Sequence, residues 1–292
     1  MTSLKEDHST PSGAGGKKNV IDSHQHFWKY HPQIHGWIND EMQVIRKDFL
    51  PADLLPLLAE NNIAGCIAVQ ADQTESETDF LIGLATENNF IKGIVGWVDL
   101  RADDIEERLQ HYQQQSIVKG FRHVLQGEKP EFMLQEKFLR GIGALKEFGF
   151  TYDILIFPQH LPAAIKLVQR FPGQKFVIDH MAKPDIKNGL IDSWKENIQF
   201  IAQFPNIYCK LSGMVTEANW KTWKKEELFP YLDVVTNAFG INRLLYGSDW
   251  PVCLVAASYA EMISPVKKYF STFTKTEQEA VFGGNAFQFY HL

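Results

Sequence analysis

The sequence predicts an α/β protein folded as a single (β/α)8 TIM barrel, on the basis of three observations. Short apolar segments rich in β-forming residues alternate with longer segments of helical periodicity. Eight strand segments are present, and several are continuous apolar runs, which is typical of strands covered by helices. The chain has 292 residues, slightly more than the ~250 residues common for this barrel. A doubly wound open sheet is the alternative, since strand counts from one sequence are prone to error.

The predicted strands are short and are spread over almost the whole chain. They cover residues 20–26, 64–70, 92–98, 118–124, 151–157, 175–180, 206–211 and 243–248. Most of the intervening segments have helical periodicity, namely residues 74–89, 102–115, 136–149, 161–172, 193–205, 229–240 and 275–290. The first of these helices is expected to open with a capping box, because Thr74 is followed three residues later by Glu77.

Composition and charge exclude several classes of protein. Apolar residues make up 45% of the chain and the net charge at pH 7 is −6, which indicates a globular protein without a nucleic-acid or anionic-membrane surface. Residues 1–19 are almost free of apolar side chains, so we expect a flexible tail rather than a secretory signal, followed by one domain over residues 20–292. Cys66, Cys209 and Cys253 form no C-x-x-C pair, which suits a reducing compartment. A cytoplasmic location is expected.

Titratable side chains accumulate where the predicted strands end. A TIM barrel places its chemistry at the C-terminal ends of its strands, so these side chains are candidates for a functional site. They are His24 and His26 on the first strand, Arg122 and His123 on the fourth, His160 after the fifth, Asp179 and His180 on the sixth, and Ser248 and Asp249 at the eighth.

The H-x-H pair formed by His24 and His26 has a direct geometric meaning. Side chains two residues apart on a strand point to the same side, so both imidazoles can reach one object. Together with His180 and Asp249 they make a donor set suited to Zn²⁺ or a similar divalent ion. The alternative for the pair alone is two hydrogen-bonded structural histidines.

Other candidates carry a weaker signal. His160 is an extra candidate ligand, but its position after Pro158 favours a loop or supporting role. Arg122 could bind a carboxylate or hydroxyl-rich substrate through its planar donors, or it could form a structural ion pair. Trp28 and Trp37 could line the mouth of a pocket, although aromatic residues in a loop more often cover the core.

Five motifs in a fixed order resemble those of a known family. They are VIDSHQHFW, KGFRHVLQ, FVIDHMAKPDI, LSGM and LLYGSDWPVC, and the closing GGNAFQFY agrees with them. This set resembles the amidohydrolase-2 branch of the metal-dependent hydrolases, which have a TIM barrel. The likeness runs from Ile21 to Tyr290. It is greatest to the lactonase subgroup that includes L-fuconolactonase, L-rhamnonolactonase and 2-pyrone-4,6-dicarboxylate lactonase.

The resemblance assigns roles to individual residues. It implies that His24, His26, His180 and Asp249 are the metal ligands and that Arg122 contacts the substrate. The fourth strand lacks the bridging Lys or Glu of binuclear members, which speaks against two ions. Some lactonases of the subgroup work without metal. The expectation is therefore at most one divalent ion, zinc if one is bound.

The predicted activity is hydrolysis of a small lactone, either a sugar lactone or a pyrone-type acid. Asp249 would activate water as the general base. The three histidines would either hold the ion or donate hydrogen bonds to the developing oxyanion, while Arg122, His123 and Trp28 would contact the substrate. The partner is thus a small molecule, with no nucleic acid or membrane. Two alternatives are a decarboxylase of an aromatic acid on the same barrel and a non-catalytic barrel that binds a sugar acid.

Overall fold

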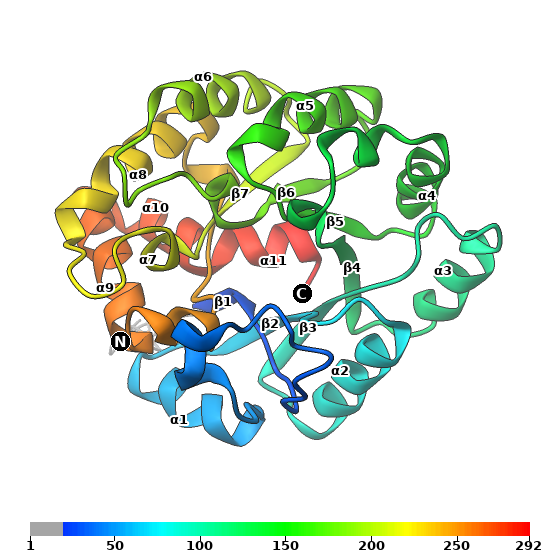
Figure 1. The fold of residues 1–292 in the computed structure, drawn as a ribbon, viewed down its shortest axis with the longest axis horizontal. Coiled ribbons are helices and arrows are strands. Elements are labelled where there is room, and N and C mark those ends of the chain that lie inside the picture. The colour runs from blue at the N-terminus through cyan, green and yellow to red at the C-terminus, as the bar shows by residue number, and fades with distance from the viewer. Residues whose placement is uncertain (1–19) are drawn as a thin grey trace, which may run out of the picture.

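The computed structural model describes residues 20–292, which form a (β/α)8 barrel (Figure 1). The tail predicted for residues 1–19 lies outside the described residues. The eight strands are parallel and pair in chain order. They are β1 (Ile21–Gln25), β2 (Gly65–Val69), β3 (Ile91–Gly96), β4 (Val118–His123), β5 (Thr151–Ile154), β6 (Phe176–Ile178), β7 (Ile207–Leu211) and β8 (Leu244–Tyr246). Every predicted strand is therefore present.

The ring is closed between β1 and the segment that follows β8. The backbone nitrogen of Asp249 donates to the carbonyl of His24 at 2.8 Å, and that of His26 donates to the carbonyl of Trp250 at 2.7 Å. This closure excludes the doubly wound open sheet, which would leave two free edges. It also places Asp249 next to the H-x-H pair.

Helices surround the ring on its outer side (Figure 1). They are α1 (Pro51–Glu60), α2 (Glu75–Glu87), α3 (Ile105–Gln113), α4 (Glu136–Glu147), α5 (Leu161–Arg170), α6 (Asp192–Ile201), α8 (Lys225–Phe239) and α9 (Tyr259–Tyr269), with a single turn, α7 (Met214–Glu217), before α8. Helices α1 and α9 were not predicted from the sequence. Each contains a proline, Pro56 and Pro265, and proline inside a helix is normally unfavourable.

The start of α2 differs in one detail from the predicted capping box. The hydroxyl of Thr74 accepts from the nitrogen of Glu77 at 3.2 Å, as expected for an N-cap. The carboxylate of Glu77, however, accepts from the nitrogen of Ala71 at 3.0 Å instead of returning to Thr74. Burial raises the pKa of Glu77 to about 7. Glu77 therefore supports the segment between β2 and α2 rather than the helix end.

The last predicted helix, over residues 275–290, is interrupted. It consists of α10 (Lys275–Glu279), a π turn (Ala280–Gly284) and α11 (Asn285–Tyr290). Helix α11 packs its apolar face against inward-facing strand residues, including Ile21 and Val177. Lys119 and Lys175, at the N-terminal ends of β4 and β6, contact His291. The C-terminal helix thus closes the end of the barrel opposite the histidines.

Among residues 20–292, no helix combines the length and the apolar character needed to cross a bilayer.

Candidate active site

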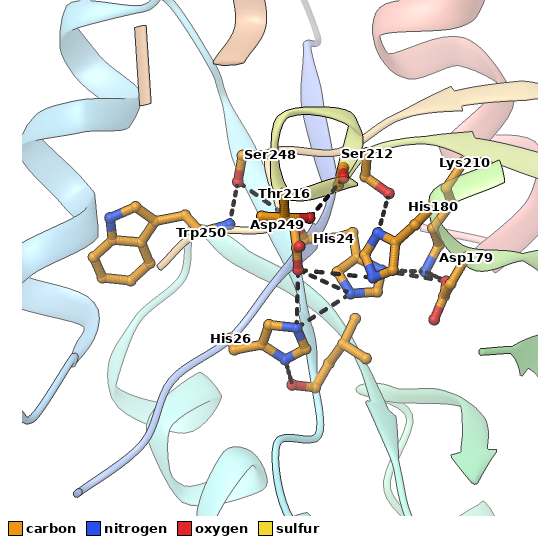
Figure 2. Close-up of polar contacts among 12 residues, drawn as sticks. His24, His26, Asp179, His180, Lys210, Ser212, Thr216, Ser248, Asp249 and Trp250 are labelled. Atoms are coloured by element: carbon orange, nitrogen blue, oxygen red, sulfur yellow. Dashed lines mark hydrogen bonds and ion pairs between the residues drawn. The ribbon is translucent and has the colours of Figure 1, made fainter. Parts of the chain in front are cut away.

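Four predicted site residues meet at the C-terminal end of the barrel (Figure 2). His24 and His26 lie on β1 or directly after it, His180 follows β6 and Asp249 follows β8. Oδ1 of Asp249 lies 3.4 Å from Nε2 of His26. The same oxygen lies 3.8 Å from the Nε2 atoms of His24 and His180. The Nε2 atoms of His24 and His26 are 3.2 Å apart, so both rings of the H-x-H pair face the same place. All four side chains are buried.

Hydrogen bonds on the far side of two rings fix their orientation. Nδ1 of His26 lies 2.8 Å from the carbonyl oxygen of Val69, which can only accept, so the ring proton is on Nδ1. Nδ1 of His180 lies 2.8 Å from Oγ of Ser212, a hydroxyl that can either donate or accept. With the proton on Nδ1, Nε2 of His26 is free to bind a metal ion, the arrangement usual for metal-binding histidines.

The backbone around the site is strained at His180 and Asp249. His180 has a φ of 52° and Asp249 a φ of 56°, the left-handed region that non-glycine residues rarely adopt. Gly213, after β7, gives His180 its space, because a Cβ atom there would lie 2.7 Å from Cγ of the imidazole. Such strain concentrates at functional sites, and here it aims a histidine and a carboxylate at one point.

The charge states of His24, His180 and Asp249 suit a cation. Burial lowers the pKa of His24 and of His180 well below the usual value, so both imidazoles are neutral. Burial alone would raise the pKa of Asp249, but the neighbouring His180 and His26 reverse this effect and hold the pKa below its usual value. The site therefore presents neutral nitrogen donors and one carboxylate.

The spacing of the donors fits a single divalent ion. His24, His180 and Asp249 each offer a ligand atom within 4.8 Å of the others, and Nε2 of His26 stands beside them. Two ligands bound to one tetrahedral zinc at 2.0–2.1 Å lie about 3.3 Å apart. The two separations that involve His26, 3.2 and 3.4 Å, agree with this value. The separations from Asp249 to His24 and to His180 are both 3.8 Å, which is too long for a hydrogen bond. These residues fit a metal ion.

A buried cluster of charged residues lies beneath the histidines, and most of it was not predicted from the sequence. Lys210 on β7 contacts Asp153 on β5 and lies 3.0 Å from Oδ1 of Asp179. Its ammonium is also 3.1 Å from Nδ1 of His24. Tyr290 of α11 donates to Oδ2 of Asp153 at 3.0 Å. The available signal was a single charged residue inside an otherwise apolar strand, in YDIL and in YCKL.

Arg122 belongs to this cluster. Its guanidinium donates to Oδ2 of Asp179 at 3.0 Å and to Oε1 of Gln70 at 2.7 Å, and it lies 3.3 Å from Nε2 of His24. The side chain is 4% exposed. Its donors thus have partners within the protein, and the predicted substrate contact of Arg122 stays a prediction.

Two other predicted substrate contacts have structural partners. His123, next to Arg122 on β4, faces the opposite side of the strand and stacks on Phe132 with ring centres 5.0 Å apart. Trp28 is 1% exposed, and its ring nitrogen donates to the carbonyl of Lys47 at 2.9 Å. Trp37 packs edge-to-face on Trp28 and remains 44% exposed.

His160 is not among the converging side chains. It is buried, and its ring nitrogens face backbone carbonyls, with Nε2 at 2.9 Å from that of Glu128 and Nδ1 at 3.3 Å from that of Phe157. The loop and supporting role is the better description of this residue.

Comparison with known proteins identifies the class to which this barrel belongs. The amidohydrolase family, Amidohydro_2, matches residues 21–292. The chain therefore belongs to the amidohydrolase family. A relative from Burkholderia multivorans named L-fucono-1,5-lactonase is 38% identical over 284 residues, which cover 93% of this chain and 96% of the relative.

Solved structures agree with this assignment. An amidohydrolase from Burkholderia multivorans with bound zinc is 38% identical and superposes with a TM-score of 0.91, covering 94% of this chain and 99% of the other. A dihydroxybenzoic acid decarboxylase from Polaromonas sp. JS666 with bound manganese and an inhibitor has a TM-score of 0.63, at 13% identity and coverages of 94% and 97%. The second likeness shows the fold alone.

Proposed function

We propose that this protein hydrolyses a small lactone, with Asp249 as the general base. The observation that carries the proposal is a buried, ionised carboxylate facing three imidazoles at the functional end of the barrel. The protein is a hydrolase of the amidohydrolase family acting on a lactone ester bond. The relative named L-fucono-1,5-lactonase supports a six-membered sugar lactone as the substrate.

Lactone hydrolysis needs a nucleophilic water, a polarised carbonyl and a protonated leaving oxygen. Asp249 accepts a proton from water as the water oxygen bonds to the carbonyl carbon. The ring C–O bond then breaks, and Asp249 returns the proton to the departing ring oxygen, which becomes a hydroxyl group. The product is the open hydroxy acid, and Asp249 ends the cycle as it began.

We infer that His24, His26, His180 and Asp249 hold a divalent ion, and the related zinc-containing structure supports zinc. Such an ion supplies a Lewis acid that polarises the carbonyl. The alternative, in which metal-free histidines donate hydrogen bonds to the oxyanion, needs protons on Nε2. In His26 the hydrogen bond to the carbonyl of Val69 puts the proton on Nδ1. This tautomer favours the ligand role for His26.

We expect the protein to bind at most one divalent ion per chain. The site offers one carboxylate, and β4 contributes Arg122, an obligate cation, at the place where a bridging ligand would be needed for two ions. The measurement is elemental analysis after zinc loading and dialysis. Two tightly bound equivalents would contradict the single-ion site, and no bound zinc would contradict the ligand role.

A pH-indicator screen of sugar lactones and pyrone acids, run with and without a chelator, tests the function. We expect acid release from a sugar lactone, loss of this activity with the chelator and recovery with zinc. Release of CO₂ from an aromatic acid without ring opening would identify the decarboxylase instead. Tight binding of a sugar acid with no turnover of any lactone would identify a non-catalytic barrel.

A further inference from the structure

The backbone from His180 to Lys183 forms a left-handed turn of four consecutive non-glycine residues. Their φ values are 52°, 55°, 59° and 50°. The nitrogen of Lys183 donates to the carbonyl of His180 at 2.8 Å, so the turn has the i to i+3 bond of a 3-10 helix. Side chains three residues apart in such a turn lie on the same side. Lys183 therefore projects to the side from which His180 enters the site.

Glu217 approaches Lys183 from the other side. It ends the short helix α7, which follows Gly213, the residue that lies against the ring of His180. Helix α7 also packs against the 3-10 turn Val252–Val255, which follows Asp249. Oε1 of Glu217 lies 3.3 Å from Nζ of Lys183. The resulting ion pair stands between the segments that carry His180 and Asp249.

The position of this pair is unusual for an ion pair that serves only the fold. The side chains of Lys183 and Glu217 are 17% and 19% exposed, so both charges lose much of their hydration, a loss that an ion pair alone seldom offsets. Each acts electrostatically on Asp249. The ammonium also lies 5.6 Å from the ring centre of Phe157, a half-buried residue after β5.

We propose that Lys183 and Glu217 form a substrate subsite that binds hydroxyl groups of a neutral sugar lactone. An ammonium donates hydrogen bonds and a carboxylate accepts them, so the pair can satisfy adjacent hydroxyls, which do both. The ring of Phe157 offers an apolar surface beside them for the C–H groups of a sugar ring. This inference rests on the proposed lactone hydrolysis and narrows its substrate class.

The same arrangement selects against an acidic substrate. The Lys183–Glu217 pair has no net charge, and Glu217 would repel a substrate carboxylate at this position. The guanidinium of Arg122, which could bind a carboxylate, already donates to Asp179 and Gln70. A neutral polyhydroxylated lactone is thus a better fit than a pyrone dicarboxylate.

The test compares two lactones that differ in their hydroxyl groups. Lys183→Met and Glu217→Gln are each assayed with a hydroxylated sugar 1,5-lactone and with δ-valerolactone, a six-membered lactone without hydroxyls. We expect kcat/KM for the sugar lactone to fall roughly tenfold to a hundredfold, mainly through KM, because each change removes a charged hydrogen bond to a hydroxyl. Activity on δ-valerolactone should change by less than about threefold.

The exposed pair Lys275–Glu279, with a separation of 3.7 Å, supplies the matched control. Lys275→Met should leave kcat/KM for both lactones unchanged. Equal losses on both lactones in the Lys183 and Glu217 variants, or no loss on either, would overturn the subsite, and thermal melting shows whether each variant is folded. A parent protein that opens neither lactone would instead contradict the proposed function.

Discussion

Asp249→Asn is expected to lower kcat by roughly 10²–10⁴-fold, the usual contribution of a general base. The amide keeps the size and shape of the side chain but cannot accept the proton from water. In the parent, Oδ1 of Asp249 faces His26 at 3.4 Å, and the surrounding histidines hold its pKa below the usual value against the effect of burial. The base is therefore ionised at neutral pH, so kcat of the parent should stay constant as the pH falls until Asp249 becomes protonated.

The comparison needs saturating zinc, because the asparagine also changes a proposed metal ligand. Turnover of a sugar lactone and thermal melting are measured for the variant and the parent. Asp103→Asn, which alters an exposed carboxylate paired with Lys137, controls for the loss of one acidic group and should be fully active. A folded Asp249→Asn protein that turns over within a few-fold of the parent would remove Asp249 from the chemistry.

The barrel itself could be predicted because its signal is repeated. Each strand is a separate apolar run, and the alternation of strands with helices fixes the fold even when individual helix limits are wrong. The convergence of His24, His26, His180 and Asp249 follows from the same rule, since all lie at strand ends that meet at one face. The two missed helices contain Pro56 and Pro265, whose local cost is outweighed by burial of the helices against the barrel.

What the sequence did not reveal depends on contacts between distant strands. The charges of Asp153 and Lys210 stand out in their strands, but 57 positions separate them, and only the closed ring brings them together. The partners of Arg122, Gln70 and Asp179, could not be read from the sequence either, because they lie on other strands or directly after them. Lys183 gave no signal, because a left-handed turn of four non-glycine residues has no sequence preference that would predict it.

Lys210→Met should produce the largest loss of stability among these changes. Lys210 is fully buried, and its ammonium contacts Asp153 and Asp179. Two cations, Lys210 and Arg122, balance these two carboxylates. Removing Lys210 leaves one negative charge uncompensated in the interior, so we expect the free energy of unfolding to fall by about 3–5 kcal/mol.

A second variant distinguishes lost charge balance from lost packing. Lys210→Met/Asp153→Asn removes one charge of each sign, so it should recover part of the stability. The amide oxygen introduced on β5 can still accept from Tyr290, which donates to Asp153 at 3.0 Å in the parent.

The measurement is urea unfolding of both variants, with Lys275→Met as the control. Lys275→Met changes an exposed residue, so its free energy of unfolding should stay within about 0.5 kcal/mol of that of the parent. A double variant no more stable than Lys210→Met would show that packing, not charge, makes Lys210 necessary. Because both variants lack the ammonium that lies 3.1 Å from Nδ1 of His24 in the parent, the stability restored in the double variant should not by itself restore lactone turnover.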